Sequence, residues 1–408
     1  MYTVLFCILA AASQAETYEF RVDIADVVEL PCGDCDGVAL GDINASGKMD
    51  ILASSGSYGD VFWFEQGQDP AQWTKRMIYS MGVDTGEFEG NDLADFDGDG
   101  RLEAVSLDQP NGRILLHKFT DPDAHQWETA VIQSQRPLVQ ASLVTDFTGD
   151  GTLELVYTWE GREEGAGGVH LLQFVGDDVL NPEHWRDHVL MQHESAWWLV
   201  PRRLDMSGNG QETDIVYTAR RMPRRNPGTR PGLYWLEITD GLEGPITRHV
   251  IDETLPHPLQ VDVGDLSGAG HDLDLVVGGF DTDIIYWFER SQDWQRHEIP
   301  LPAEVNDVTP DRVWNIKPIP VPGSRDALLA PITGNGRGAL MCFEYIDGAY
   351  RPNVLMLLDY THPMDDRVIL HDLTGNGIPE AIIPDSGPGI DRLLIIQFSI
   401  APAPEEGR

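Results

Sequence analysis

One stretch constrains what this chain can fold into more than any other: Asp95-Phe96-Asp97-Gly98-Asp99-Gly100-Arg101-Leu102-Glu103. It reads D-x-D-x-D-G-x-x-E, with side-chain oxygens at positions 1, 3, 5 and 9 and the backbone carbonyl of Arg101 at position 7. Such a set suits a hard cation that takes about six to eight oxygen ligands, as calcium does. An EF-hand loop needs flanking helices and a bidentate glutamate at position 12, where Ser106 stands. The apolar run 104–107 predicts a strand instead, so we expect a calcium loop inside a β-hairpin.

The loop recurs along the chain at a nearly fixed interval. Its closing acids are 51 to 60 residues apart, at Asp50, Glu103, Glu154, Asp214, Asp274, Asp326 and Glu380. In the loops that begin at Asp205 and Asp265 the closing acid comes one residue late, and Ala269 lacks a side-chain oxygen. The sixth loop, Pro-Ile-Pro-Val-Pro-Gly at 318–323, keeps the spacing of the repeat but has no side-chain oxygens at the ligand positions. A period of this size is typical of solenoids, propellers and arrays.

Four of the loops are predicted to hold metal. Their candidate ligands are Asp42, Asn44, Ser46 and Asp50; Asp95, Asp97, Asp99, Arg101 (through its carbonyl) and Glu103; Asp146, Thr148, Asp150 and Glu154; and Asp372, Thr374, Asn376 and Glu380. The alternative is that these loops are simple turns, since Asp and Gly dominate turns in any case.

Each repeat reads as four short strands. One leads into the loop and one follows the closing acid; the third is aromatic-rich, as in 61–65 and 285–289, and the fourth begins near a tryptophan, as in 73–78. Four strands in each of seven repeats predict an all-β fold, a seven-bladed β-propeller. The last repeat lacks a fourth strand, and residues 18–24 form a spare one. We therefore expect the N-terminal strand to close the ring; the alternative is an open array with a frayed start.

With the loops and the strand order in view, the chain resembles the FG-GAP/VCBS-repeat propellers, which are similar to the propeller of integrin α subunits. The resemblance covers about residues 18–400 and rests on the D-x-D-x-D-G loops and on a third strand that reads W-[FL]-E. It implies calcium in the loop between the first and second strands of a blade. It does not supply a function, because function in such folds lies elsewhere on the ring.

Composition and the N-terminus indicate the compartment. Residues 1–15 are apolar and end in Ser13-Gln14-Ala15, which predicts a signal peptide, a propeller domain over 16–400 and a tail over 401–408. We expect a secreted or periplasmic monomer. The net charge of −39 argues against nucleic acid and anionic membranes as partners. Cys32 and Cys35 are spaced for a small disulfide loop, and Cys342 stands in an apolar strand.

Candidate functional residues fall on the face opposite the D-x-D-x-D-G loops. The connections there carry His193, His257, Tyr360 and His362 as candidate acids or bases, and Arg312 and Arg367 as groups that would neutralise a carboxylate. An arginine cluster at Arg220, Arg221, Arg224 and Arg225 is either an anion site or a partner for nearby acids. Of the adjacent Trp197 and Trp198, one is expected to pack in the blade. Trp198 is the candidate ring for a sugar, unless both belong to the core.

Two functions are compatible with these features. The chain has no G-x-S-x-G, H-E-x-x-H or P-loop motif, which favours a non-catalytic module that binds an extracellular glycan or protein, with an acidic polysaccharide the first candidate. The alternative is a polysaccharide lyase or sugar dehydratase at the channel mouth, in which one of the histidines or Tyr360 removes a proton next to a uronate carboxyl group.

Overall fold

The computed structural model describes residues 20–33, 35–56, 58–82, 87–121, 125–163, 165–200, 202–220, 230–239, 241–270, 274–358, 368–387 and 390–402. The predicted signal peptide and residues 403–408 of the predicted tail lie outside these ranges. The helices of the described part are three 3₁₀ turns, η1 (Pro182–His184), η2 (Gly241–Glu243) and η3 (Arg290–Gln292). None of them approaches the length or apolarity needed to cross a membrane.

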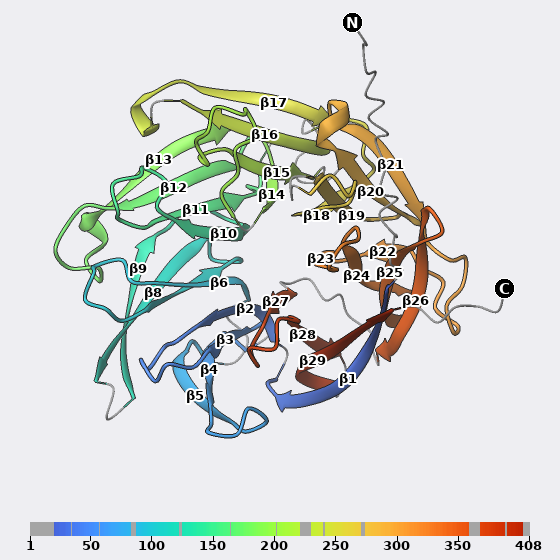
Figure 1. The fold of residues 1–408 in the computed structure, drawn as a ribbon. Coiled ribbons are helices and arrows are strands. Elements are labelled where there is room, and N and C mark those ends of the chain that lie inside the picture. Colours follow the sequence, from blue (N-terminus) through green and yellow to red (C-terminus); the bar gives the residue numbers. More distant parts are fainter. Residues whose placement is uncertain are drawn as a thin grey trace, which may run out of the picture.

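Antiparallel sheets of short strands are arranged in a ring, so the fold is a β-propeller (Figure 1). The strands form where buried β-branched and aromatic residues alternate with turn residues, as in Val61–Phe64 of the first blade. Five sheets of the described chain have four strands each. Four of them are β2 (Cys35–Gly41), β3 (Asp50–Ser55), β4 (Asp60–Gln66) and β5 (Trp73–Ser80); β6 (Phe88–Ala94), β7 (Glu103–Asp108), β8 (Arg113–Asp121) and β9 (Gln126–Gln133); β10 (Val139–Thr145), β11 (Glu154–Trp159), β12 (Gly168–Phe174) and β13 (Trp185–Gln192); and β14 (Ala196–Leu199), β15 (Ile215–Ala219), β16 (Gly232–Ile238) and β17 (Ile246–Asp252).

The fifth four-stranded sheet joins the two ends of the chain, which confirms the predicted closure. It contains β27 (Ile369–His371), β28 (Glu380–Gly387), β29 (Ile390–Pro402) and, at its outer edge, β1 (Phe20–Pro31). β1 pairs with β29 from Phe20↔Pro402 to Pro31↔Arg392. It is also bonded to the neighbouring sheet, because the amide of Val22 donates to Glu344 at 2.6 Å and Asn353 donates to the carbonyl of Val22 at 3.1 Å.

The prediction of seven separate four-stranded blades is wrong in one region. Residues 258–358 form one nine-stranded sheet: β18 (Pro258–Gly264), β19 (Asp274–Phe280), β20 (Ile284–Glu289), β21 (Gln295–Pro300), β22 (Arg312–Val313), β23 (Lys317–Ile319), β24 (Ala327–Gly334), β25 (Arg337–Ile346) and β26 (Ala349–Leu358). β18 to β21 pair in succession, as do β23 to β26, and β22 pairs with both β19 and β24.

Glycine at position 278 explains this fusion. A Cβ there would lie 2.5 Å from the carbonyl oxygen of Val313, so only glycine allows β22 to come this close. Three other blades carry a hydroxyl at the same point, four residues after the closing acid. Ser54 donates to Phe88 O at 3.2 Å, Thr158 donates to Trp197 O at 2.9 Å, and Thr218 donates to Leu259 O. Each bond reaches the inner strand of the next blade, so backbone contact at Gly278 replaces a side-chain link.

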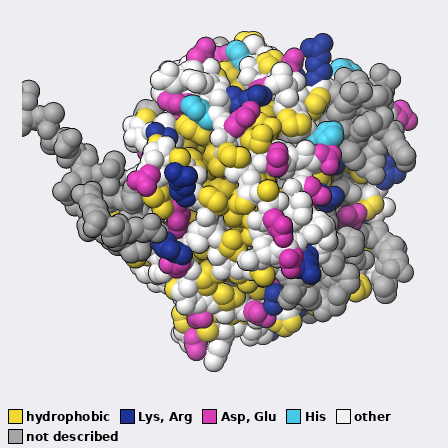
Figure 2. Space-filling model, turned by 90° about the vertical axis from the view of Figure 1, so that its right-hand side faces the viewer, with side chains coloured by type: hydrophobic (Ala, Val, Ile, Leu, Met, Phe, Trp, Pro, Cys, Tyr) yellow, Lys and Arg dark blue, Asp and Glu magenta, His cyan; other side chains and the backbone are white. Residues whose placement is uncertain are grey.

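The outer strands of five blades are irregular at the same place. β5, β9, β13, β17 and β26 each shift register against their neighbours. One apolar residue near each shift is exposed: Met77, Val131, Val189, Val250 and Val354. A bulged edge resists pairing with another chain, which protects these edges. On the face over β21 and β26, hydrophobic side chains are interspersed with acidic and basic ones (Figure 2).

Deleting the chain up to and including Ile24 should expose the edge of β29, because β1 is its partner. Unpaired edges recruit other chains. We expect soluble aggregates or loss of folded protein, measured by size-exclusion chromatography and thermal melting. A truncated protein that stays monomeric and melts as the full chain does would contradict the closure.

Gly278→Val should lower the melting temperature, because the added side chain would overlap the Val313 carbonyl. Overpacking of this kind costs about 1–3 kcal/mol. Thr218→Val is the matched control in the preceding blade, since it removes only the bond to Leu259 and should cost about 1 kcal/mol. Equal melting of wild type and Gly278→Val would show that β22 does not need the glycine.

Candidate functional site

The seven loops identified in the sequence lie on one face of the ring. Each connects the inner strand of a blade to its second strand, for example β2 to β3 and β27 to β28. In six loops the first aspartate accepts the amide of the sixth residue, a glycine: Gly47, Gly100, Gly151, Gly210, Gly270 and Gly377, at 2.7–3.1 Å. The loops therefore share one conformation, whether or not their spacing is regular.

The closing acids are buried and hold the loops in place. In the same six loops the closing carboxylate accepts the backbone amide of the second loop residue: Ile43, Phe96, Phe147, Met206, Leu266 and Leu373, at 2.6–3.1 Å. Asp214 and Asp274 also accept amides from the end of the third strand, at 3.4 and 3.0 Å. The closing acid that comes one residue late thus makes the same contact as the regular ones.

The Asp95 loop brings three carboxylates together. One carboxylate oxygen from each of Asp95, Asp97 and Asp99 lies within 4.8 Å of the others. Oδ1 of Asp95 is buried and has no hydrogen-bond partner among the described residues. Burial raises the pKa of Glu103, the closing acid, to about 7. A set of hard oxygen donors with one unpaired buried oxygen fits a calcium ion.

Lys118 of β8 also contacts this loop, and the sequence pattern did not indicate this contact. Its Nζ lies 2.9 Å from Asp99 Oδ2 and 3.3 Å from Glu103 Oε1, and it donates to Asp97 as well. Burial alone would lower the pKa of Lys118, but the hydrogen bonds to Asp97 and Asp99 raise it above its ordinary value. The register of the third strands aligns Lys118 with glutamates and glutamines elsewhere: Glu65, Gln173, Glu237, Glu289 and Gln397. The ammonium group of Lys118 therefore places a positive charge beside the most acidic loop.

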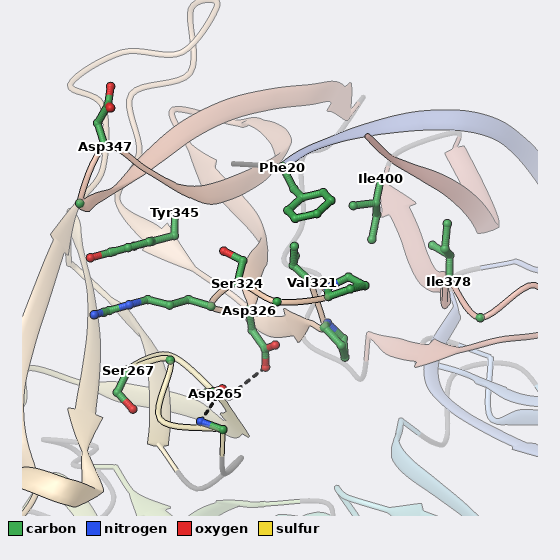
Figure 3. Close-up of a pocket in the computed structure, with 18 residues that line it drawn as sticks. Phe20, Asp265, Ser267, Val321, Ser324, Asp326, Tyr345, Asp347, Ile378 and Ile400 are labelled. Carbon is green, nitrogen blue, oxygen red and sulfur yellow. Dashed lines mark hydrogen bonds between the residues drawn. The ribbon is translucent and has the colours of Figure 1, made fainter. Parts of the chain in front are cut away.

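The sixth loop lines a cavity of about 1120 Å³ on this same face (Figure 3). Three further cavities lined by described residues measure about 360, 320 and 270 Å³. The large cavity lies between the loop after β18, the loop after β23, and residues near the ends of β1, β25 and β29. Its apolar side carries Phe20, Val321, Ile378 and Ile400. This cavity was not predicted from the sequence; the signal that could have indicated it is the loss of acidic residues in loop six.

The polar side of the cavity is organised around Arg325. The guanidinium carbon lies 4.1 Å from the centre of the Tyr345 ring, and Nη1 donates to the carbonyl of Leu266 at 2.9 Å. Nearby, Oδ1 of Asp265 and Oγ of Ser267 are buried and have no hydrogen-bond partner among the described residues. Both oxygens are enclosed by the protein and lie behind the surface of the cavity.

Asp326 fixes the position of the two loops that line the cavity. It accepts the amide of Asp265 at 2.9 Å and its own amide donates to the carbonyl of Asp265 at 2.9 Å (Figure 3). The loop at Pro318–Gly323 lacks the aspartates of its counterparts and has prolines, which have no N–H, in their place. The sixth closing acid thus bonds to the neighbouring loop.

The candidate residues of the opposite face are only partly described. His193 Nδ1 lies 2.9 Å from the carbonyl of Gly165, and His257 Nδ1 lies 3.2 Å from Asp281. Arg312 packs beside Phe280, with its guanidinium carbon 5.0 Å from the ring centre. Tyr360, His362 and Arg367 lie outside the described residues. The contacts described for the three visible residues do not bring them together around one reacting point.

Arg220 is engaged inside the protein. Its Nη2 lies 2.9 Å from Glu160 Oε1, and its guanidinium carbon lies 3.3 Å from the centre of the Trp197 ring. Because Glu160 follows β11 of the preceding blade, these contacts match the intramolecular interpretation of the cluster. Arg221, Arg224 and Arg225 lie outside the described residues. Trp198 is only 5% exposed, which matches the core interpretation of that residue.

The predicted thiol pattern agrees with the structure. Cys32 and Cys35 form a disulfide, and Cys342 is a free, buried cysteine whose pKa is raised by burial.

Comparison with known proteins supports the fold and leaves the family open. No protein-family model matches the chain, and no curated protein matches it. Among solved structures, the chain is similar to one described as the Dos1 propeller, with 8% sequence identity and a TM-score of 0.51. The match covers 92% of this chain and 94% of that chain. At this identity the likeness shows the β-propeller fold and no shared function.

Proposed function

We propose that this protein is an extracellular β-propeller that acts as a binding module for a glycan or a protein, in seven repeats stabilised by calcium. The observation that carries the proposal is the 1120 Å³ cavity beside the one loop that has lost its acidic residues. A concave site with an apolar side and a few buried polar groups is the usual form of a ligand site. The FG-GAP/VCBS resemblance supports the same type of protein through its repeat pattern.

Calcium in this proposal stabilises the fold and takes no part in chemistry. In the second loop it would be held by Asp95, Asp97, Asp99, Glu103 and the carbonyl of Arg101. Bound there, the ion would offset the repulsion between carboxylates that lie within 4.8 Å of one another. It would also compete with the ammonium of Lys118 for the same oxygens.

Calcium should raise the melting temperature, and a chelator should lower it. A ligand that binds only the folded state adds about 2.7 kcal/mol at a concentration of 100 Kd. Asp97→Ala should reduce this calcium effect, whereas Ser267→Ala, in a loop without predicted metal, should leave it unchanged. Differential scanning calorimetry with calcium and with chelator measures both. An identical midpoint under the two conditions would reject calcium as a stabilising ion.

Lys118→Gln should enlarge the response to calcium. The substitution gives the second loop the residue that Gln173 and Gln397 supply at this position in other blades. Without calcium the variant should melt below wild type, because three carboxylates lose their counter-charge; with calcium the difference should narrow or reverse. Gln173→Lys is the reciprocal control and should weaken the response of the Asp146 loop. An unchanged calcium response in Lys118→Gln would mean that the lysine does not compete with the ion.

Binding is tested by applying the labelled protein, with calcium, to an array of neutral and acidic glycans and immobilised matrix proteins. Retention on any of these classes supports a binding module, and failure to bind all of them contradicts it. The prediction that an acidic polysaccharide binds at the arginine cluster is tested on the same array. Ultraviolet absorbance of the bound acidic glycans separates binding from a lyase reaction, because elimination creates an unsaturated, absorbing product.

A further inference from the structure

We propose that a uronate unit of an acidic saccharide binds in the cavity of about 360 Å³, with its carboxylate on Arg325. The inference rests on the proposed binding function and names a ligand class and the residues that select it. This cavity shares Arg325 and Tyr345 with the large one. We call it the His297 groove and define it by Trp287, Glu289, His297, Arg325, Tyr345 and Tyr350.

One wall of the groove comes from β20 and β21. The rings of Trp287 and His297 are stacked with their centres 4.0 Å apart. Nε2 of His297 lies 3.1 Å from Glu289 Oε2, and the hydroxyl of Ser291 donates to Glu289 Oε1 at 2.6 Å. The side chains of His297 and Glu289 are 30% and 17% exposed, so neither is enclosed by the protein. This wall therefore presents an imidazole and a carboxylate.

The other wall carries Arg325 and Tyr345. The guanidinium lies over the Tyr345 ring, and its Nη1 donates to the carbonyl of Leu266 at 2.9 Å. Tyr345 extends away from Phe20 and Ile400, so its hydroxyl lies at the end that is remote from the apolar side of the large cavity (Figure 3). Within the described residues the side chain of Tyr345 makes only ring contacts. Its hydroxyl therefore needs a partner from outside them.

Arg325 is the charged group of the groove that lacks a counter-charge. A guanidinium has five N–H donors, and within the described residues that of Arg325 makes one hydrogen bond and no ion pair. Of the two glutamates that line the groove, Glu289 has the two contacts given above, and Glu298 lies 3.2 Å from Arg296. Because a carboxylate matches the planar guanidinium with two parallel hydrogen bonds, it is the group that fits Arg325 best.

The wall opposite Arg325 distinguishes a uronate from other carboxylates. Ring hydroxyls of a sugar can donate to Glu289, whereas an acidic peptide would place further carboxylates beside it. A neutral sugar would satisfy Glu289 equally well but would leave Arg325 without a counter-charge. The volume of about 360 Å³ falls at the lower end of the range of small-ligand pockets, about 300–1,000 Å³. It therefore suits a single sugar unit of a longer chain.

A purely structural role is the alternative for Arg325. Arg290 makes a similar bond, from Nη2 to the carbonyl of Asp205 at 2.8 Å. Arg290 differs in that it lines none of the four cavities described above. It is therefore the matched control, because its loss removes the same kind of link between loops and leaves the groove intact.

The experiment measures binding to the full chain with calcium present, by isothermal titration calorimetry. The acidic probe is β-1,4-linked tetraglucuronate, and cellotetraose is the neutral saccharide with the same linkage. Tetraglutamate is the acidic peptide. The variants are Arg325→Gln, Tyr345→Phe, which keeps the ring on which the guanidinium packs, and the control Arg290→Gln. Melting curves establish that all three are folded.

Tetraglucuronate should bind the wild type more tightly than cellotetraose or tetraglutamate does. Arg325→Gln should weaken its binding about tenfold or more, because hydrogen bonds between charged groups are the strong ones. Tyr345→Phe removes one neutral hydrogen bond and should weaken it about fivefold. Arg290→Gln should lower the melting temperature and leave the affinity unchanged.

Absence of tetraglucuronate binding overturns the inference, and so does equal or tighter binding of cellotetraose or tetraglutamate. Tetraglucuronate binding that persists in both Arg325→Gln and Tyr345→Phe overturns the location. An equal loss of affinity in Arg290→Gln also overturns it, because the loss would then follow from loosened loops. None of these results contradicts the proposed binding function if the array shows retention of some glycan or protein, so the two proposals can fail separately.

Discussion

The buried closing carboxylate is the contact on which the loop face of this propeller depends. A carboxylate removed from water is costly unless donors surround it, and here the donors are backbone amides of the loop that it closes. The acid therefore dictates the path of the loop, and the loop in turn presents its remaining oxygens outward. Burial raises the pKa of four of these acids: that of Asp50 to about 6, that of Glu103 to about 7, and those of Glu154 and Asp214 above their ordinary values. Hydrogen bonds within the protein thus define the conformation of the loop.

The blades are joined by a second set of contacts that follows the same repeat. Hydroxyls at Ser54, Thr158 and Thr218 donate to the inner strand of the next blade. On the loop face, arginines donate to carbonyls of the preceding loop: Arg203 to Asp146 O at 2.7 Å, Arg290 to Asp205 O at 2.8 Å, and Arg325 to Leu266 O at 2.9 Å. The hydroxyls recur at one position in three blades, whereas the arginines come from different positions of their repeats. Neighbouring blades are therefore linked without one strict pattern, and single blades can vary. The fused sheet at Gly278 is one such variation.

Much of this fold could be read from the sequence, because periodic spacing and strand composition are local properties. The position of the loops and the order of strands in a repeat follow from residues that lie next to one another in the chain. The closure by β1 follows from the strand count at the two ends, because the last repeat lacks a fourth strand and residues 18–24 supply a spare one. The fusion at Gly278 could not be read in the same way, although the pair Gly278-Gly279 was visible, since it depends on where Val313 lies in space. The contact of Lys118 with the Asp95 loop could not be predicted either, because it also depends on the folded arrangement. Lys118 is 15 residues from Glu103 in the chain, and only the pairing of β7 with β8 brings it to the loop.

The candidate site shows the limit of reasoning from motifs most clearly. Conspicuous charged and aromatic residues, at Arg220–Arg225 and Trp198, predicted a binding site. In the structure Arg220 is paired with Glu160, and Trp198 is buried. The cavity lies where the repeat motif fails. In the sixth loop prolines replace the oxygen-bearing residues at positions 1, 3 and 5, and Val321 replaces the glycine found at position 4 of most other loops, so the loop offers no side-chain ligands for a cation. Its closing acid bonds to loop five instead. The space that this rearrangement leaves is walled by loop five on one side and by Phe20 and Ile400 of the closing sheet on the other. In a protein built from repeats, a repeat that keeps its frame but loses its ligands is therefore where a distinct surface can arise, because the neighbouring repeats continue to hold the ring together.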